Sequence, residues 1–576
     1  NAVRCQLRYT PNASSIIGFT NNRQGSLPAP TRPVMMSPKI PRLVTALLTL
    51  SLLLTACAGA VPAAPTALSL TSTPATLPAV TSMPALPLRI SFTAAVPLKM
   101  QELVRQNTTL QFSSDSADFT LELDTSGQGD ASWVYTLVSA FPTISDGVTL
   151  ADLKEAWQGQ KVETFPGAPL VMSAETRALL TAAWGSSGGL AVEVVAAPGI
   201  PDRLWQEDTP WGIIPFEELN PRLKLLTVDG FSPFRKDLDP SVYPLAFRFR
   251  FAGDAALRTR LDSALQGTTL TNRDESKMTT VLLTGVTALA RRTAMTMNEK
   301  GVLYPAENIG DLLRSADITH TSNEASFFSG CPAPRETFQR FCSDPAYLQL
   351  LQHAGVDVVE LTGNHLVDYG TDSMLESLEL YRLNGFKVYG GGENLQGAAQ
   401  ALLIEDHGNK IAFAGCNFVG PESVWATEST PGANPCSSDP EFGLVKQLSD
   451  EGYNVIYTIQ FIENCEVKPL SAQRTEFRLA AEAGAALVIG SQAHCPQGFS
   501  LAGGTFIHYG LGNLFFDQMM EPNRLEFLDW AVFYEGRLLG VDLVTARLYD
   551  YAQPALTAPA ERARLLNQVF ENSEWK

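Results

Sequence analysis

Polar residues that can bind a cation or a substrate follow several apolar runs in the second half of the chain. The run 356–361 is followed by Asn364 and His365, and the run 488–490 is followed by Gln492 and His494. Imidazole and amide groups at the ends of neighbouring strands can serve as ligands of a divalent cation, with imidazole the stronger. These positions are the first candidates for a functional site.

Other apolar runs in this half also end in polar residues or in turns. The run 281–284 leads to Val286, the next leads to Asn323 and Glu324, and the run 455–459 leads to Gln460. A glycine-rich turn at 390–394 precedes a helical pattern, and the segment 508–517 contains Asn513. In this order the segments of residues 278–520 resemble the CapA family of capsule (poly-γ-glutamate) synthesis proteins.

The resemblance implies a metallophosphatase-like fold, a four-layer α/β/β/α sandwich with its ligands at strand ends. It implies His365 and His494 as catalytic residues, and as metal ligands it implies Glu324, Asn364, His365 and His494. The substrate pocket would be formed by Asn323, Glu324, Asn364, Gln460, Gln492 and Asn513.

Three residues depart from the family pattern and put an ordinary two-metal site in doubt. Val286 stands in the place of an aspartate, and Gln460 and Gln492 stand in the places of histidines. A valine has no donor atom, and amide oxygens are weaker ligands than imidazole or carboxylate. Three interpretations stay open: a polar pocket without a catalytic metal, a single-metal site without turnover, and a working phosphoesterase or peptide hydrolase. No cofactor is certain; one divalent metal ion is the candidate.

A lipoprotein signal peptide is predicted at residues 35–57. A basic segment around Lys39 and Arg42 precedes a short apolar run, which ends in Leu54, Thr55, Ala56 and Cys57. Cleavage before Cys57 and lipidation of its sulfur would anchor the mature chain to a membrane. Residues 1–34 are expected to lie upstream of the true start, and the Ala-, Pro- and Thr-rich residues 58–87 to form a tether.

Six cysteines remain after Cys5 and Cys57, all in the C-terminal half. An even number in an exported chain favours disulfides, although a zinc site is the competing interpretation. Short sequence separation favours the pairs Cys331 with Cys342, Cys416 with Cys436, and Cys465 with Cys495.

Residues 88–275 alternate strand and helix patterns, with a helix expected over 150–157. Segments near residues 146–159 and 211–216 resemble, loosely, periplasmic solute-binding proteins of the phosphate type. That resemblance implies a two-lobed α/β domain. Residues 521–576 are expected to add strands and a terminal helix to the CapA-like domain.

The chain has 576 residues and a formal net charge of -18, without a basic stripe that could follow a nucleic-acid backbone. Nucleic acid is therefore excluded as a partner, and a polyanion would require a local basic patch or a bridging cation. The favoured function is the synthesis or export of a surface polymer by an extracytoplasmic, lipid-anchored protein. Its partners would be the membrane, through the lipid, and the polymer or its synthesis machinery. The alternatives are a metal-dependent phosphoesterase or γ-glutamyl hydrolase, and a solute-binding receptor; whether the chain is an enzyme stays open.

Overall fold

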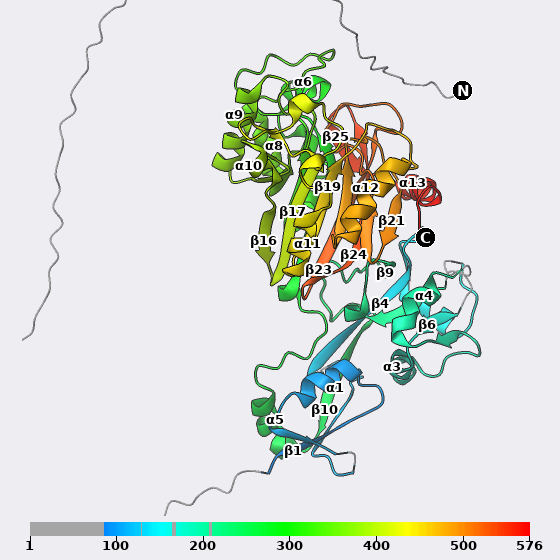
Figure 1. Cartoon of the computed structure of the whole chain (residues 1–576). Coiled ribbons are helices and arrows are strands. Elements are labelled where there is room, and N and C mark those ends of the chain that lie inside the picture. Colours follow the sequence, from blue (N-terminus) through cyan, green and yellow to red (C-terminus); the bar gives the residue numbers. More distant parts are fainter. Residues whose placement is uncertain (1–85, 114, 128, 164–168, 207–209, 576) are drawn as a thin grey trace, which may run out of the picture. The chain divides into compact units, whose positions relative to one another are not determined.

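The long apolar runs of the sequence form the strands of three large β-sheets, with helices between them in the chain (Figure 1). The computed structural model describes residues 86–575 except 114, 128, 164–168 and 207–209. The predicted signal peptide, Cys57 and nearly all of the tether lie outside the described residues. The prediction of a mixed α/β fold is confirmed.

The first sheet has ten strands and is organised around the long strand β4, Ala131–Ala140. The first half of β4 pairs with β10, and its second half pairs with β8 and β9. The other strands and the helices of this half are β1 Leu88–Phe92, β2 Leu110–Phe112, β3 Phe119–Leu123, β5 Gly147–Val148, β6 Leu170–Met172, β7 Val192–Val194, β8 Gly212–Pro215, β9 Leu223–Val228, β10 Ala246–Gly253, α1 Leu98–Arg105, α2 Leu150–Trp157, α3 Ala174–Trp184, α4 Ile200–Leu204 and α5 Arg258–Leu265. The helix predicted over 150–157 is thus present as α2, where the Thr149 side chain accepts a hydrogen bond from the Asp152 backbone N–H.

The second sheet has seven strands in the order β14-β13-β12-β11-β23-β24-β25. Strands β11 to β14 are parallel, and β23 to β25 continue the sheet in antiparallel pairing. The strands and their accompanying helices are β11 Met278–Thr287, β12 Ile318–Asn323, β13 Val358–Glu360, β14 Lys387–Tyr389, β23 Leu525–Tyr534, β24 Arg537–Tyr549, β25 Gln553–Leu556, α6 Arg291–Lys300, α7 Gly310–Arg314, α8 Leu348–His353, α9 Thr371–Leu383 and α10 Leu395–Ala399.

The third sheet has six strands in the order β16-β17-β19-β20-β22-β21, and β17, β19, β20 and β22 run parallel. Its elements are β16 Leu402–Asp406, β17 Asn409–Asn417, β19 Asn454–Gln460, β20 Leu487–Ser491, β21 Phe499–Ala502, β22 Thr505–His508, α11 Gly443–Asp450 and α12 Ser471–Glu482. A small ribbon of β15 Gly391–Gly392 and β18 Gly432–Ala433 and the terminal helix α13 Pro559–Glu571 complete the chain.

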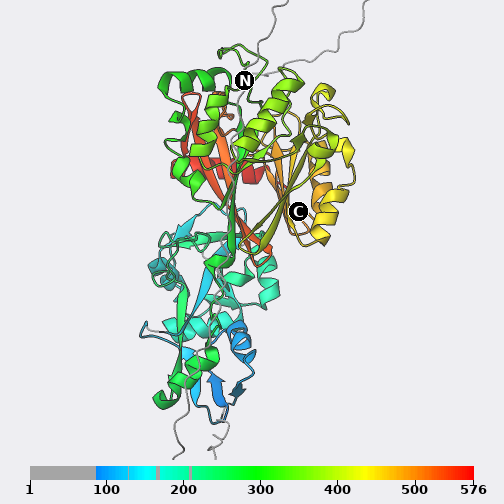
Figure 2. The same cartoon turned by 90° about the vertical axis from the view of Figure 1, so that its left-hand side faces the viewer.

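The seven-stranded and six-stranded sheets share a hydrophobic core. Val281 and Leu283 of β11 join Phe413 of β17 and Ile456 of β19 in one buried cluster. The alternate residues of the same strands point to the other face of each sheet and pack against helices. Leu282 lies in a cluster with α6, α8 and α9, and Val455 lies in a cluster with α11 and α12. This alternation is that of strands buried on both faces. Figure 2 shows the two groups of helices on opposite sides of the paired sheets.

The two halves of the described chain are joined by a packed aromatic contact. Phe141, directly after β4, is 1% exposed. Its ring centroid lies 4.9 Å from that of Phe506 and 5.9 Å from that of Phe499, and it also contacts Phe570 and Trp575. Ion pairs add to this contact, including Arg562 of α13 with Asp146.

No helix among the described residues is long and apolar enough to cross a membrane.

We predict that Phe141→Ala lowers the free energy of unfolding by about 3 to 5 kcal/mol, because it removes a buried ring and leaves a cavity between the two halves. Urea denaturation followed by tryptophan fluorescence measures the change. Phe231→Ala is the matched control, since Phe231 is 37% exposed and its loss should cost about 0.5 kcal/mol. Equal losses for the two variants would show that the Phe141 contact does not hold the halves together.

Candidate functional site

The predicted site lies where the carboxyl ends of strands from two sheets meet. Strands β11, β12 and β13 bring Val286, Glu324 and Asn364 to one side. Strands β19 and β20 of the other sheet bring Gln460 and the segment after Ser491 to the opposite side. Parallel strands place their carboxyl ends at one edge, so residues far apart in sequence become neighbours there. The two sides touch through the side-chain amide of Gln460, which lies 3.3 Å from Oδ1 of Asn364.

Glu324 is the buried carboxylate at the centre of this edge. The residue is 2% exposed, and its backbone N–H donates to the Thr287 carbonyl at 2.9 Å. Neither carboxylate oxygen has a hydrogen-bond partner among the described residues. The neighbouring turn comes so close that a Cβ on Gly363 would lie 2.8 Å from the Glu324 Cα, which explains why a glycine stands there. Burying a carboxylate without a hydrogen-bond partner is costly, and a cation bound beside it would offset that cost.

His494 faces Glu324 with one ring nitrogen and is held by the other. Its Nδ1 lies 2.8 Å from Oδ1 of Asn513, and its Nε2 lies 3.9 Å from Oε1 of Glu324. An amide oxygen can only accept, so Nδ1 carries a hydrogen and Nε2 is the ring nitrogen that faces Glu324. A histidine held through Nδ1 in this way can bind a metal through Nε2.

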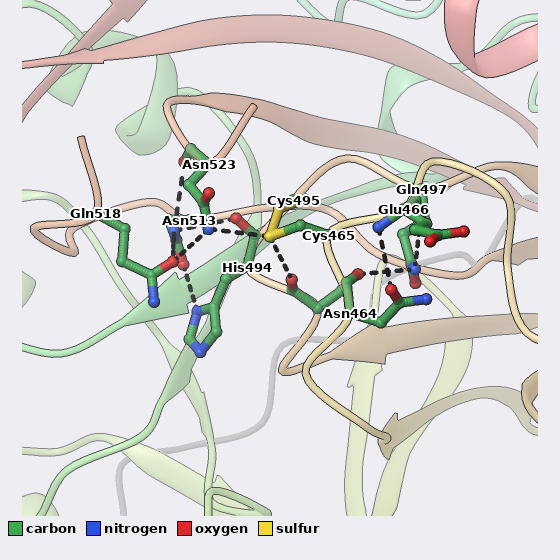
Figure 3. Close-up of a disulfide and its surroundings, with 10 residues drawn as sticks. Asn464, Cys465, Glu466, His494, Cys495, Gln497, Asn513, Gln518 and Asn523 are labelled. Carbon is green, nitrogen blue, oxygen red and sulfur yellow. Dashed lines mark hydrogen bonds between the residues drawn. A yellow bond between two sulfur atoms is a disulfide. The ribbon is translucent and has the colours of Figure 1, made fainter. Parts of the chain in front are cut away.

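A disulfide next to His494 fixes the backbone of this segment (Figure 3). Cys495, the next residue, is bonded to Cys465. The side chain of Asn523 donates to Sγ of Cys465 and to Gln518, and the Asn513 amide donates to the His494 carbonyl at 3.2 Å. The structure therefore places His494 and Asn513, two of the predicted site residues, within one polar network.

His365 is oriented in a similar way by a carboxylate. Its Nδ1 lies 2.6 Å from Oδ2 of Asp368, and its ring stacks on Phe341 with centroids 4.0 Å apart. Burial disfavours the charged ring, but the hydrogen bond to Asp368 and the negative charges of Glu324 and Asp368 outweigh it and raise the pKa of His365 above 6.5. The same carboxylates would also attract a divalent cation.

The two glutamines occupy their side of the site by contacting each other and neighbouring amides. The side-chain amide of Gln460 contacts those of Gln492, Asn364 and Asn417. Gln460 is 2% exposed and Gln492 6% exposed. Val286 is buried at the end of β11 and offers only backbone groups, which pair with Gly512 and Leu514. Among the described residues, Val286, Gln460 and Gln492 thus supply no carboxylate or imidazole for a second ion.

One predicted pocket residue does not join the site. The Asn323 side chain donates to the hydroxyl of Tyr381 in α9 and to the Ala325 carbonyl, so it faces the helices. Neighbouring residues of a strand point to opposite faces, and Glu324 takes the inward position. The assignment of Asn323 to the substrate pocket is corrected accordingly.

The sequence analysis missed two residues beside the site. Glu360 is fully buried at the end of β13, where Thr362 donates to it, and the main cause that raises its pKa is burial, with Glu324 adding to the effect. Asn417 ends β17 and contacts Gln460. The available signals were Glu360, a charged residue near the end of the run 356–361, and Asn417, a polar residue at a strand end.

Glu324, His365 and His494 offer carboxylate and imidazole donors for a divalent cation, although their ligand atoms do not all lie within 4.8 Å of one another. Two free carboxylate oxygens and two imidazoles with anchored Nδ1 atoms form a suitable donor set for Mn²⁺, Fe²⁺ or Zn²⁺. Across the part of the chain that the structure describes, a tighter group of ligand-type atoms occurs elsewhere, at Asp317, Asp406 and His407. There the ammonium of Lys236 already contacts Asp317 at 2.8 Å and His407 at 3.2 Å, so that group is an ion-pair cluster.

The six cysteines form three disulfides, in the pairing that short sequence separation favoured. They are Cys331–Cys342, Cys416–Cys436 and Cys465–Cys495. The competing zinc interpretation of these cysteines is thereby excluded.

Known proteins resemble the chain mainly in its C-terminal half. Residues 249–518 match the family model described as bacterial capsule synthesis protein PGA_cap. The capsule biosynthesis protein CapA of Bacillus anthracis is 20% identical over 312 residues, which cover 52% of this chain and 74% of that protein. The PGA biosynthesis protein CapA of Bacillus subtilis (strain 168) is 25% identical over 178 residues, which cover 31% of this chain and 47% of that protein.

Solved structures with some likeness include two of different kinds. The NAD nucleotidase of Haemophilus influenzae has a TM-score of 0.30 and 10% identity, covering 52% of this chain and 57% of its own. An ABC-type phosphate transport receptor from Vibrio cholerae has a TM-score of 0.26 and 14% identity, covering 31% of this chain and 93% of its own.

The family model over residues 249–518 and both curated relatives support the assignment of the C-terminal half of this chain to the CapA family of bacterial capsule synthesis proteins.

Proposed function

We propose that this protein acts in the synthesis or export of a capsule or other surface polymer, such as poly-γ-glutamate or a polysaccharide. The observation that carries the proposal is the family match over residues 249–518, together with two relatives whose names assign them to capsule and PGA biosynthesis. The partner is then the polymer or the machinery that makes it.

The fold proposed for this half is a four-layer α/β/β/α sandwich of the metallophosphatase type. The shared core of the two sheets and the helix clusters on their other faces support it. For residues 88–275 we propose a two-lobed domain like those of solute-binding proteins, which the division of β4 between two sets of partner strands supports. Residues 521–576 then complete the C-terminal domain with β23, β24, β25 and α13.

The proposed location is the outer face of the cell membrane, held by a lipid on Cys57. The support is the sequence pattern at residues 35–57. Three disulfides fit an oxidising compartment outside the cytoplasm.

We propose that the site binds one divalent cation in place of the two of an ordinary two-metal centre. Glu324, His365 and His494 would bind it, with the side-chain oxygen of Asn364 as a weaker ligand. Gln460, Gln492 and Asn513 would shape the pocket around it. The support is the carboxylate of Glu324, which has no hydrogen-bond partner among the described residues, and the Nε2 of His494 at 3.9 Å from it.

A metal-dependent hydrolase of phosphoesters or γ-glutamyl bonds is the second candidate. The orientation of His365 by Asp368 favours it, because a carboxylate-held histidine can bind a metal or transfer a proton. A bound cation would polarise a phosphoryl or carbonyl oxygen of the substrate. The replacements at Val286, Gln460 and Gln492 favour the binding function over this one.

We predict that deleting the gene in the source cell removes most of the surface polymer, and that the full-length chain restores it. Cys57→Ser should release the protein into the medium or periplasm and restore much less polymer, because the anchor is lost. Immunoblots of membrane fractions and colorimetric assay of extracted polymer measure both effects. Unchanged polymer after deletion would contradict the proposed function.

We predict about one equivalent of Mn, Fe, Zn or Mg per chain in the protein purified without chelators. Glu324→Gln and the double variant His365→Ala, His494→Ala should lose it, and Asn513→Ala should weaken binding roughly tenfold to a hundredfold by freeing the His494 ring. Elemental analysis and competition with a metal-binding dye measure this.

The control for this experiment is His353→Ala, because His353 is exposed and belongs to no predicted site. Its metal content should equal that of the parent. Two equivalents per parent chain, or metal retained without Glu324, would contradict the single-cation centre.

A further inference from the structure

A second cavity opens beside the candidate site, and the sequence analysis assigned it no role. Its volume is about 330 Å³, at the lower end of the range for small-ligand pockets. It lies between α6 and the segment 331–344, which the Cys331–Cys342 disulfide closes. We call it the arginine pocket after Arg291 and Arg340, two of its lining residues; Asp344 and Tyr369 also line it.

Both arginines are held in place while keeping donors for a ligand. Arg291 pairs with Asp517, and its guanidinium carbon lies 4.6 Å from the Phe341 ring centroid. Arg340 donates through Nε and Nη2 to the Asp368 carbonyl, and its guanidinium carbon lies 4.6 Å from the Tyr369 ring centroid. The Nη1 groups of both have no hydrogen-bond partner within the described ranges. Pre-positioned guanidinium groups lose little entropy when they bind an anion.

Phe341 and Asp368 link the arginine pocket to His365 of the candidate site. Phe341 stacks on His365 with one face and lies under Arg291. Asp368 accepts from Arg340 through its backbone carbonyl, from the Phe341 N–H through Oδ2 at 2.7 Å, and contacts Nδ1 of His365 at 2.6 Å. Asp368 therefore contacts both His365 and the arginine that would bind the ligand group.

The charge of the pocket selects the kind of anion. Asp517 pairs with Arg291, and the carboxylate of Asp344 also lines the pocket, so the surplus positive charge is small. A singly charged planar group that accepts two hydrogen bonds matches this balance better than a doubly charged phosphate. The rest of the chain is acidic, with a formal net charge of -18, so this local pair of arginines matters for any polyanion.

We propose that the arginine pocket binds a carboxylate of an anionic chain and so places the next unit of that chain at the His365 site. The inference rests on the proposed function, since it assumes that the chain handles a carboxylate-bearing polymer. It adds a binding subsite, Arg291 and Arg340, and a ligand class for it.

The test is a binding titration of the full-length protein in detergent with a γ-linked glutamate decamer. A γ-linked glutamine decamer is the neutral comparison, and a polyphosphate of equal length is the doubly charged one. Arg340→Gln should weaken binding of the glutamate decamer about tenfold or more. Arg340→Lys should recover part of the loss, because lysine restores the positive charge but not the paired N–H donors of the guanidinium group. The matched control is Arg335→Gln, an exposed arginine of the same loop that does not line the pocket, with less than about a twofold effect.

Each outcome decides the matter. A selective loss in Arg340→Gln, with no binding of the glutamine decamer, supports the subsite. Equal losses in Arg340→Gln and Arg335→Gln, or tighter binding of polyphosphate, overturn it. A parent protein that binds no glutamate decamer also overturns it, while the polymer content of the deletion strain still reports separately on the proposed function.

Discussion

The arrangement of this site depends on one buried carboxylate. Glu324 is almost fully enclosed, and neither of its oxygens accepts a hydrogen bond from the described residues. An ionised carboxylate in such a place costs several kcal/mol unless a positive charge compensates it. The Nε2 of His494 lies 3.9 Å from Oε1 of Glu324 and is a candidate to share a cation with it. A cation bound between them would offset this cost, and Asn513, Cys495 and Asp368 would then support its ligands.

The fold brings together residues of the site that lie far apart in the sequence. Glu324 comes from the seven-stranded sheet, while His494 follows β20 of the six-stranded sheet. The Asn513 amide holds the ring of His494, the Cys465–Cys495 disulfide holds its backbone, and Asp368 holds the ring of His365. Since each ring is fixed through Nδ1, little reorganisation is needed when a ligand arrives. The backbone carbonyl of Asp368 also accepts a hydrogen bond from Arg340, which lines the arginine pocket.

Much of this could be predicted from the sequence, because the signals were local. The apolar runs at 281–284, 455–459 and 488–490 predicted β11, β19 and β20, and the helical pattern over 150–157 predicted α2. The three disulfides followed from short separations between cysteines. What could not be predicted depends on tertiary contacts. The outward direction of Asn323 follows from strand parity, which a motif match does not consider. The contact of Arg340 with Asp368 joins two loops 28 residues apart and leaves no pattern in the sequence.

The most direct test of the account is a crystal structure of the protein soaked with Mn²⁺, with data collected near the manganese absorption edge. The account predicts one anomalous peak within coordination distance of Glu324 and His494, and none beside Gln460 and Gln492. Two peaks would show a complete two-metal centre despite the glutamines. No peak, with Glu324 bonded to a water or a rearranged donor, would contradict the claim that this carboxylate is buried to hold a cation.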